Sequence, residues 1–364
     1  MRVVAKVGTS SLTDEHGVID TAAVAKTADE IAAVRTAGHE VVLVSSGAVA
    51  AGLPALGIPG DRRPRDARTL QAVSAVGQAR LMQTWGRHLG EHDLVAGQVL
   101  LAPLDFMVRA QYLHARSTLE RLLELGVVPV VNENDAIADD EIRFGDNDRI
   151  AALVAQLVGA DLLLLLTDAP GLMDADPRFE PGASLIEEIV EIDHELEALA
   201  GGTGSVRGSG GMASKLAAAK MASWSGVRAV IAAANRPGVL MDALEGVVGV
   251  GTTVQPRDRR LTARKLWIAF ALPAQGRIVI DDGAVRALSA GGRSLLAAGV
   301  VSVDGRFSAD DAVEIVDGAG AVVAKGLSRV DAQELGVMAG RRSSELFDGS
   351  GEVVHADDLV MLPG

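Results

Sequence analysis

The feature that most constrains this chain of 364 residues is an alternation of short apolar runs with longer stretches of helical spacing. Over about the first 250 residues, each run of β-branched residues or leucine is followed by a stretch in which apolar residues recur every three or four positions. Such an alternation is typical of successive βαβ units. Most runs are apolar at every position, which indicates a parallel sheet that is buried on both faces.

Six runs are predicted strands: residues 3–7, 40–44, 95–100, 127–131, 162–166 and 228–232. Five stretches are predicted helices: residues 21–36, 67–89, 111–125, 148–158 and 212–225. Gly38, Gly126, Gly159 and Gly226 stand where a left-handed glycine commonly ends a helix. We therefore expect an α/β fold with an open, mainly parallel sheet and helices on both faces.

The pattern changes near residue 260, where a polar and mostly basic stretch interrupts the periodicity. We predict a linker at residues 259–274, between a first domain at 1–258 and a second at 275–364. The second domain has short predicted strands at 277–280, 300–303, 312–316 and 321–324. Turn signals at Asp304-Gly305 and Asp317-Gly318 favour a small β-rich fold there.

Composition excludes several classes of function. The chain has no cysteine, so a disulfide framework, a thiolate zinc site and a cysteine nucleophile are all excluded. A net charge of −14 argues against a general binder of nucleic acids, whose phosphates attract clustered lysine and arginine. The first residues form a strand pattern instead of an export signal, and no apolar run approaches the ~20 residues that span a bilayer. We expect a cytoplasmic protein without a membrane segment.

Only six of the 34 basic residues are lysine, so a lysine beside a strand-to-helix turn is informative. Lys6 ends the first predicted strand and is followed by Gly8, Thr9 and Ser10, a turn that offers backbone N–H donors beside a cation. The alternative is a lysine that snorkels from an edge strand. Ser46 and its neighbours follow the second strand in a similar position, where an ordinary serine N-cap is the alternative.

Carboxylates and amides gather after the fourth predicted strand, in Asn132-Glu133-Asn134-Asp135 and Gly145-Asp146-Asn147-Asp148. The carboxyl ends of parallel strands are where open α/β sheets bind ligands, and carboxylates there suit a substrate with an ammonium group. The alternative is a solvated loop of turn-forming residues.

Two further motifs stand at the end of a predicted strand and before a predicted helix. Thr167-Asp168 closes the most apolar strand, although a plain Pro-Gly turn would also explain the residues after it. A glycine-rich segment at 204–215 leads into a helix and a lysine, and its alternative is a disordered linker. It matches neither the P-loop nor the dinucleotide fingerprint.

Taken in order, these motifs resemble those of the amino-acid-kinase family over essentially the whole chain. Residues 294–300, with Gly305-Arg306-Phe307, are similar to a PUA domain. Ser209, where the family commonly has threonine, and Met173, where it often has tyrosine, depart from the pattern. The resemblance implies the amino-acid-kinase fold and phosphorylation of the γ-carboxylate of L-glutamate by ATP, the first step of proline biosynthesis.

The resemblance also implies roles for individual residues. Phosphoryl transfer would depend on Lys6, Lys215 and Asp148. Glutamate would be bound by Ser46, Asp135 and Asn147. The nucleotide would be bound by Lys6, Thr167, Asp168, Ser209, Gly210, Gly211, Met212, Ala213, Ser214 and Lys215.

Further expectations concern ligands and partners. Mg²⁺ is expected to accompany ATP, held largely by phosphate oxygens and water. The resemblance implies proline as a feedback inhibitor, with the loop at 138–143 as a candidate element, and a homo-oligomer is expected. Related kinases of acetylglutamate, aspartate or uridylate share the phosphate motifs and are alternatives.

A PUA-like tail also raises RNA binding as an alternative function. Residues 275–364 contain eight basic and 14 acidic side chains, and their only aromatic residues are Phe307 and Phe347. Such a tail has neither a phosphate-neutralising patch nor a stacking platform. We expect a structural or regulatory role for it.

Overall fold

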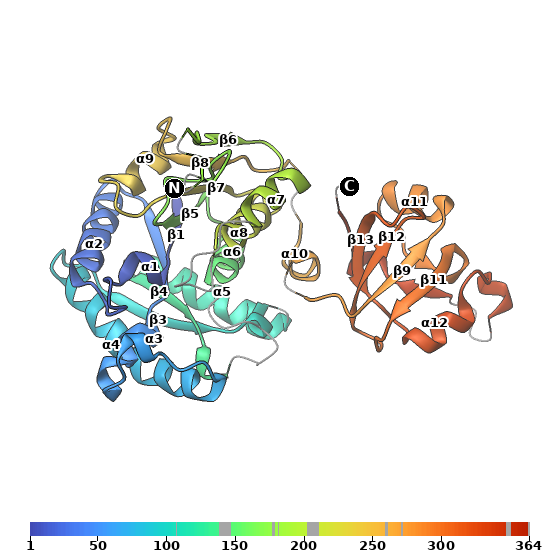
Figure 1. Cartoon of the computed structure of the whole chain (residues 1–364), viewed down its shortest axis with the longest axis horizontal. Coiled ribbons are helices and arrows are strands. Elements are labelled where there is room, and N and C mark those ends of the chain that lie inside the picture. Colours follow the sequence, from blue (N-terminus) through green and yellow to red (C-terminus); the bar gives the residue numbers. More distant parts are fainter. Residues whose placement is uncertain are drawn as a thin grey trace. The chain divides into compact units, whose positions relative to one another are not determined.

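The computed structural model describes residues 1–106, 108–137, 147–176, 179–180, 182–201, 211–258, 261–270, 272–346 and 351–362. The chain forms two compact units, Met1–Arg260 and Leu261–Gly364 (Figure 1). No helix in the described ranges is long and apolar enough to cross a membrane.

The first unit is built on an eight-stranded sheet in the order β3-β4-β2-β1-β5-β7-β8-β6. Its strands are β1 (Arg2–Val7), β2 (Glu40–Ser45), β3 (Ala96–Leu101), β4 (Val128–Glu133), β5 (Leu162–Thr167), β6 (Glu188–Ile189), β7 (Arg228–Ala233) and β8 (Gly251–Val254). In the order of the sheet, the strands β3, β4, β2, β1, β5 and β7 pair in parallel with their neighbours. Strand β8 then runs antiparallel to β7. The predicted mainly parallel sheet is confirmed. The sequence did not predict β6 or β8, because two and four residues are too few to show a periodicity.

The five predicted helices are present, with ends within two residues of the expected ones. They are α2 (Thr21–Thr36), α4 (Ala67–Gly90), α5 (Arg109–Glu124), α6 (Asn147–Leu157) and α8 (Met212–Trp224). Four shorter helices join them: α1 (Thr9–Leu12), α3 (Ala48–Gly52), α7 (His194–Gly201) and α9 (Val239–Glu245). Gly38, Gly126, Gly159 and Gly226 all have positive φ, as helix-ending glycines do.

Alternation along β1 decides which helices meet which side chains. Val3, Ala5 and Val7 belong to a core cluster that includes residues of α2, α4 and α9. Because successive side chains of a strand point to opposite faces, Val4 and Lys6 face the other side. That side is covered by α6 and α8, which pack on β1 and β5 (Figure 1). The alternation therefore directs a lysine toward the starts of these two helices.

The second unit contains a five-stranded sheet in the order β11-β9-β12-β13-β15. Its strands are β9 (Gly276–Ile280), β11 (Val300–Gly305), β12 (Ala312–Val316), β13 (Val322–Leu327) and β15 (Leu359–Met361). A two-stranded sheet joins β10 (Leu295–Leu296) to β14 (Glu352–Val354), and the unit also contains the helices α11 (Asp282–Ser289) and α12 (Ala332–Met338). The expected β-rich fold is confirmed, with a core that includes Ile278, Phe307 and Val313.

The stretch expected to be a linker contains a helix, α10 (Ala263–Phe270). Leu266 and Ile268 of α10 are buried, and the helix packs on β13 and β15 of the second unit. The sequence did not predict α10, because its short apolar segment directly follows the basic residues near 260. We propose that this helix belongs to the second domain.

Helices α3 and α4 pack so closely that only glycine fits between them. A Cβ atom added to Gly77 would lie 1.8 Å from the carbonyl oxygen of Ala48, and one added to Gly52 would lie 2.1 Å from that of Val73. Both distances are far below van der Waals contact. Helix α4 is therefore seated at a fixed depth against the segment that follows β2.

This contact predicts the effect of a small substitution. Gly77→Ala should lower the free energy of unfolding by about 1–3 kcal/mol, because the added methyl group forces α3 away from α4. Gly86→Ala in the same helix is the matched control, since a Cβ there meets nothing within 4 Å. It should be stabilising by about 0.4–1 kcal/mol. Urea denaturation measures both, and equal values for the two variants would refute the packing argument.

Candidate functional site

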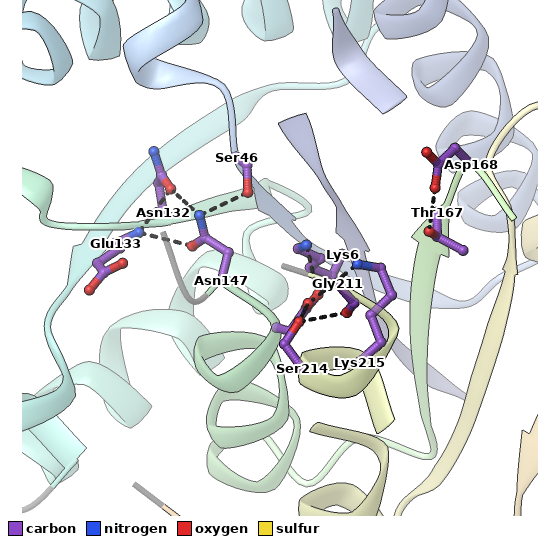
Figure 2. Close-up of polar contacts among 11 residues, drawn as sticks. Lys6, Ser46, Asn132, Glu133, Asn147, Thr167, Asp168, Gly211, Ser214 and Lys215 are labelled. Carbon is purple, nitrogen blue, oxygen red and sulfur yellow. Dashed lines mark hydrogen bonds and ion pairs between the residues drawn. The ribbon is translucent and has the colours of Figure 1, made fainter. Parts of the chain in front are cut away.

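The polar motifs of the sequence meet at the carboxyl ends of four adjacent parallel strands, β4, β2, β1 and β5. Lys6 lies in β1, Ser46 follows β2, Asn132 lies in β4 and Thr167 ends β5. Figure 2 shows these residues along one edge of the sheet. The parallel topology thus brings together residues as far apart in the chain as Lys6 and Thr167.

A buried carboxylate joins two lysines at the centre of this edge. Lys6 Nζ lies 2.6 Å from Asp148 Oδ1, and Lys215 Nζ lies 3.4 Å from Asp148 Oδ2. The exposed fractions of Lys6, Asp148 and Lys215 are 4%, 1% and 5%. In Figure 2 the two lysine side chains converge near Gly211 and Ser214. With all three groups ionised, this cluster has one net positive charge, which suits an anionic ligand.

Each member of the cluster has a defined place in the secondary structure. Asp148 lies in the first turn of α6 and Lys215 in the first turn of α8. Lys6 belongs to β1, which lies between β2 and β5, so the edge-strand alternative for this lysine is wrong. Gly8 leaves room for its ammonium group, because a Cβ there would lie 3.3 Å from Lys6 Nζ.

The electrostatics of the cluster follow from burial and charge together. Burial alone would raise the pKa of Asp148, but Lys6, Lys215 and the hydroxyl of Ser214 outweigh it and hold that pKa below its ordinary value. Ser214 Oγ donates to Asp148 Oδ2 at 2.6 Å. Burial lowers the pKa of Lys215, with the nearby charge of Lys6 acting in the same direction and Asp148 opposing both.

A chain of amides connects the next two strands. Asn147 Nδ2 donates to Ser46 Oγ at 3.0 Å and to Asn132 Oδ1 at 2.9 Å. The backbone N–H of Glu133 donates to Asn132 Oδ1 and to Asn147 Oδ1. Ser46 is not an N-cap, because α3 begins after Gly47 and has no side-chain cap. Its hydroxyl is therefore fixed by Asn147 instead, beside the start of α6.

Asp135 begins a short 3-10 turn, Asp135–Ile137, beyond β4. Its carboxylate Oδ2 accepts a hydrogen bond of 2.6 Å from Ser74 Oγ of α4. Burial raises the pKa of Asp135, while the Ser74 hydrogen bond and the charge of Arg63 oppose the rise. A partly buried carboxylate of this kind gains most from a cationic partner.

Two of the residues predicted to bind a nucleotide, Thr167 and Asp168, lie on the other side of the lysines from Asn147. Thr167 Oγ1 donates to Asp168 Oδ1 at 3.0 Å at the end of β5 (Figure 2). Gly211 precedes α8, and Met212, Ala213 and Ser214 form its first turn. The N–H groups of a first turn lack helical acceptors and suit phosphate oxygens. Ser209, Gly210 and the loop at 138–143 lie outside the described residues, as do Gly145 and Asp146.

Four polar residues of the site were not predicted individually. Asn132 and Ser45 stand in predicted motifs without a role of their own, while no pattern in the sequence points to Ser74 or Gln78. The available signal was weak: Ser74 and Gln78 are polar residues one helical turn apart on the buried face of α4. Within the described ranges, no group of three or more histidine, aspartate or glutamate side chains could hold a metal ion.

Comparison with known proteins identifies related families for both parts of the chain. Residues 1–233 match the amino acid kinase family, and residues 276–347 match the PUA domain. A glutamate 5-kinase of Ralstonia nicotianae is 46% identical, with 99% of this chain and 97% of the relative covered. A glutamate 5-kinase of Nocardia farcinica is 47% identical over 98% of this chain and 96% of the relative.

The shared carboxylate predicts a large effect of neutralising Asp148. Asp148→Asn should lower the free energy of unfolding by about 3–5 kcal/mol at pH 7, because two buried ammonium groups lose their counter-charge. Since the folded pKa of Asp148 is depressed, its contribution is present above the unfolded pKa and is lost as pH falls through the folded one. Urea denaturation at pH 7 and at acidic pH measures both effects.

A surface pair provides the control for this prediction. Glu120→Gln removes the charge that faces Arg116 one turn away on α5, where both side chains are exposed. It should cost about 0.3–0.5 kcal/mol. A loss no larger in Asp148→Asn than in Glu120→Gln would contradict the electrostatic role of the buried cluster.

Proposed function

The chain belongs to the amino acid kinase family, and we propose that it transfers the γ-phosphoryl group of ATP to the γ-carboxylate of L-glutamate, the glutamate 5-kinase reaction. The full-length relatives named glutamate 5-kinase support this reaction. The observation on which the mechanism depends is the convergence of Lys6 and Lys215 on Asp148.

Phosphoryl transfer between two anions requires neutralisation and placement more than covalent chemistry. The transferring group spreads negative charge over its oxygens, and fixed cations stabilise that charge without reorganising. Lys6 and Lys215 supply the cations, and Asp148 restricts the positions of their ammonium groups. This carboxylate therefore acts on geometry, so that its loss lowers turnover more than nucleotide binding.

The acceptor needs no general base. A glutamate side chain has a pKa of about 4.3 and is ionised at neutral pH. Asp135 would pair with the α-ammonium group of the substrate, while Ser46 would donate a hydrogen bond to a substrate carboxylate oxygen. Asn147, whose amide hydrogens are directed to Ser46 and Asn132, would keep that hydroxyl in place. Ser46 follows β2, which pairs with the strand that holds Lys6; Asp135 lies beyond β4, on the far side of β2; and Asn147 begins α6, which packs on β1. Attack in line with the leaving ADP would follow from this placement.

The nucleotide would lie across Thr167, Asp168 and the first turn of α8. Ser209 and Gly210 complete this proposed set by their place in the motif. The carboxylate of Asp168 is an oxygen donor of the kind that Mg²⁺ prefers, and it is near enough to Lys215 to influence the pKa of that lysine. When bound, Mg²⁺ would neutralise charge on the β- and γ-phosphates.

A substrate panel tests the proposed reaction. The full chain is incubated with ATP, Mg²⁺ and hydroxylamine, and γ-glutamyl hydroxamate and ADP are measured with L-glutamate, L-aspartate or N-acetylglutamate. Formation of hydroxamate and ADP only with L-glutamate is expected. Turnover of another acceptor in preference to glutamate would reject the proposal.

The two lysines generate a first kinetic prediction. Lys6→Ala and Lys215→Ala should each lower kcat by about 10³-fold or more, since each removes a cation from the transferring phosphoryl group. Lys220→Ala is the control, because Lys220 lies on the same helix but pairs with Glu197 at the surface. It should retain kcat within about twofold. Wild-type kcat in both test variants would contradict the mechanism.

Asp135 generates a second kinetic prediction. Asp135→Ala should raise the KM for glutamate by about 10- to 100-fold, the value of a lost charge-assisted interaction, with little change in the KM for ATP. Asp135→Asn, which keeps an acceptor for Ser74 but removes the charge, should give a similar rise. An unchanged KM for glutamate in both variants would remove Asp135 from the substrate site.

A further inference from the structure

One face of α4 contacts three of the segments that form the substrate side of the site. Ser74 Oγ donates to Asp135 Oδ2 at 2.6 Å, and Gln78 Oε1 accepts from Asn132 Nδ2 at 2.8 Å. Further along the helix, Trp85 Nε1 donates to Ser45 Oγ at 2.9 Å. Residues 74, 78 and 85 lie on one side of the helix, since they are separated by one and three turns. The side chains of α4 therefore reach the ends of both β2 and β4.

The position of this helix face is set by backbone contact. Gly77, which lies between Ser74 and Gln78, has no space for a Cβ atom against Ala48 of α3. Ser74 itself is 3% exposed. A hydroxyl held at this depth has few alternative partners, so it fixes the oxygen to which it is bonded.

From this contact we propose that Ser74 is a positioning residue for the amino-acid substrate and acts through Asp135. Its hydroxyl occupies one lone pair of Oδ2 and stops the carboxylate from rotating about its last side-chain bond. The remaining lone pairs then have a constant direction toward an α-ammonium group. The inference deepens the proposed function, because it assumes that Asp135 binds the ammonium group of glutamate.

The same hydrogen bond affects the protonation of Asp135. It stabilises the ionised carboxylate and so opposes the rise in pKa that burial causes. Among the described residues, Arg63 is the charged group that faces Asp135, and it acts in the same direction. Removing the Ser74 hydroxyl therefore raises the pKa of Asp135 further, and leaves a larger fraction of the enzyme with a neutral, non-binding Asp135 at acidic pH.

The test compares Ser74→Ala with the wild-type full chain. We expect a rise of about tenfold in the KM for glutamate, the lower end of the range for a hydrogen bond to a charged group. The KM for ATP and kcat should stay within about twofold. The acid limb of kcat/KM for glutamate, which reports groups of the free enzyme, should move to higher pH.

Ser223→Ala is the matched control for a merely structural effect. Ser223 is 4% exposed, lies in α8 and donates a 2.6 Å hydrogen bond to the backbone carbonyl of Gln255. The Ser223→Ala variant loses the same hydroxyl oxygen from a similarly buried position on a helix. Its pH profile and its KM for glutamate should therefore match those of the wild type. In an Asp135→Asn background, Ser74→Ala should add less than a twofold rise, because coupled residues are non-additive.

Several results would overturn the inference. An unchanged KM for glutamate in Ser74→Ala, an acid limb that does not move, or parallel rises in the KM values for glutamate and ATP would each reject the positioning role. A full additional effect of Ser74→Ala in the Asp135→Asn background would show that Ser74 does not act through Asp135. If the wild type forms no glutamyl hydroxamate, the proposed function itself fails, which is distinct from a failure of Ser74→Ala alone.

Discussion

The carboxylate of Asp148 is the interaction on which the site depends. A buried ion pair must recover the cost of removing charges from water, and a carboxylate shared by two ammonium groups does so at short distance. The arrangement needs three elements in register: the centre of the sheet, the start of α6 and the start of α8. An error of one residue in β1 would turn Lys6 to the face covered by α2 and α4. The fold and the charge cluster therefore constrain each other.

The site divides into two halves with different chemistry. On one side of the lysines are the end of β5 and the first turn of α8, which offer N–H groups, a hydroxyl and a carboxylate at the edge. On the other side are amides, joined by the hydrogen bonds that Asn147 donates to Ser46 and Asn132, and the carboxylate of Asp135, and both groups are contacted by α4. This division suits two ligands that meet at the lysines, with the nucleotide on one side and the amino acid on the other.

Much of the fold and part of the site could be predicted from the sequence. The apolar runs located six strands because burial on both faces leaves a strong local signal. The motifs pointed to Lys6 and Lys215 because only six of the 34 basic residues are lysine, while the role of Asp148 followed from the family resemblance. The helix α10 was missed, since Leu266, Trp267 and Ile268 stand among basic residues. Strands β6 and β8 were missed because each is too short to show a period. Ser74 and Gln78 could not be identified, because nothing in the sequence around a polar residue on a long helix indicates which distant residue it contacts.

The sequence alone was sufficient to determine the class of fold and the ends of the main helices, since periodicity and helix-end signals depend on residues that are close in the chain. It also showed which charged side chains stand near the ends of strands and the starts of helices. Only the tertiary structure decided that Lys6 lies in a central strand, that Ser46 bonds to Asn147 instead of capping a helix, and that α4 supports Asp135. The position of Lys6 depends on the order of the strands in the sheet. The support of Asp135 depends on how closely Gly77 allows α4 to pack against α3. The contacts of Ser46 and Asp135 join residues that are 101 and 61 positions apart in the chain, a separation that no local pattern records.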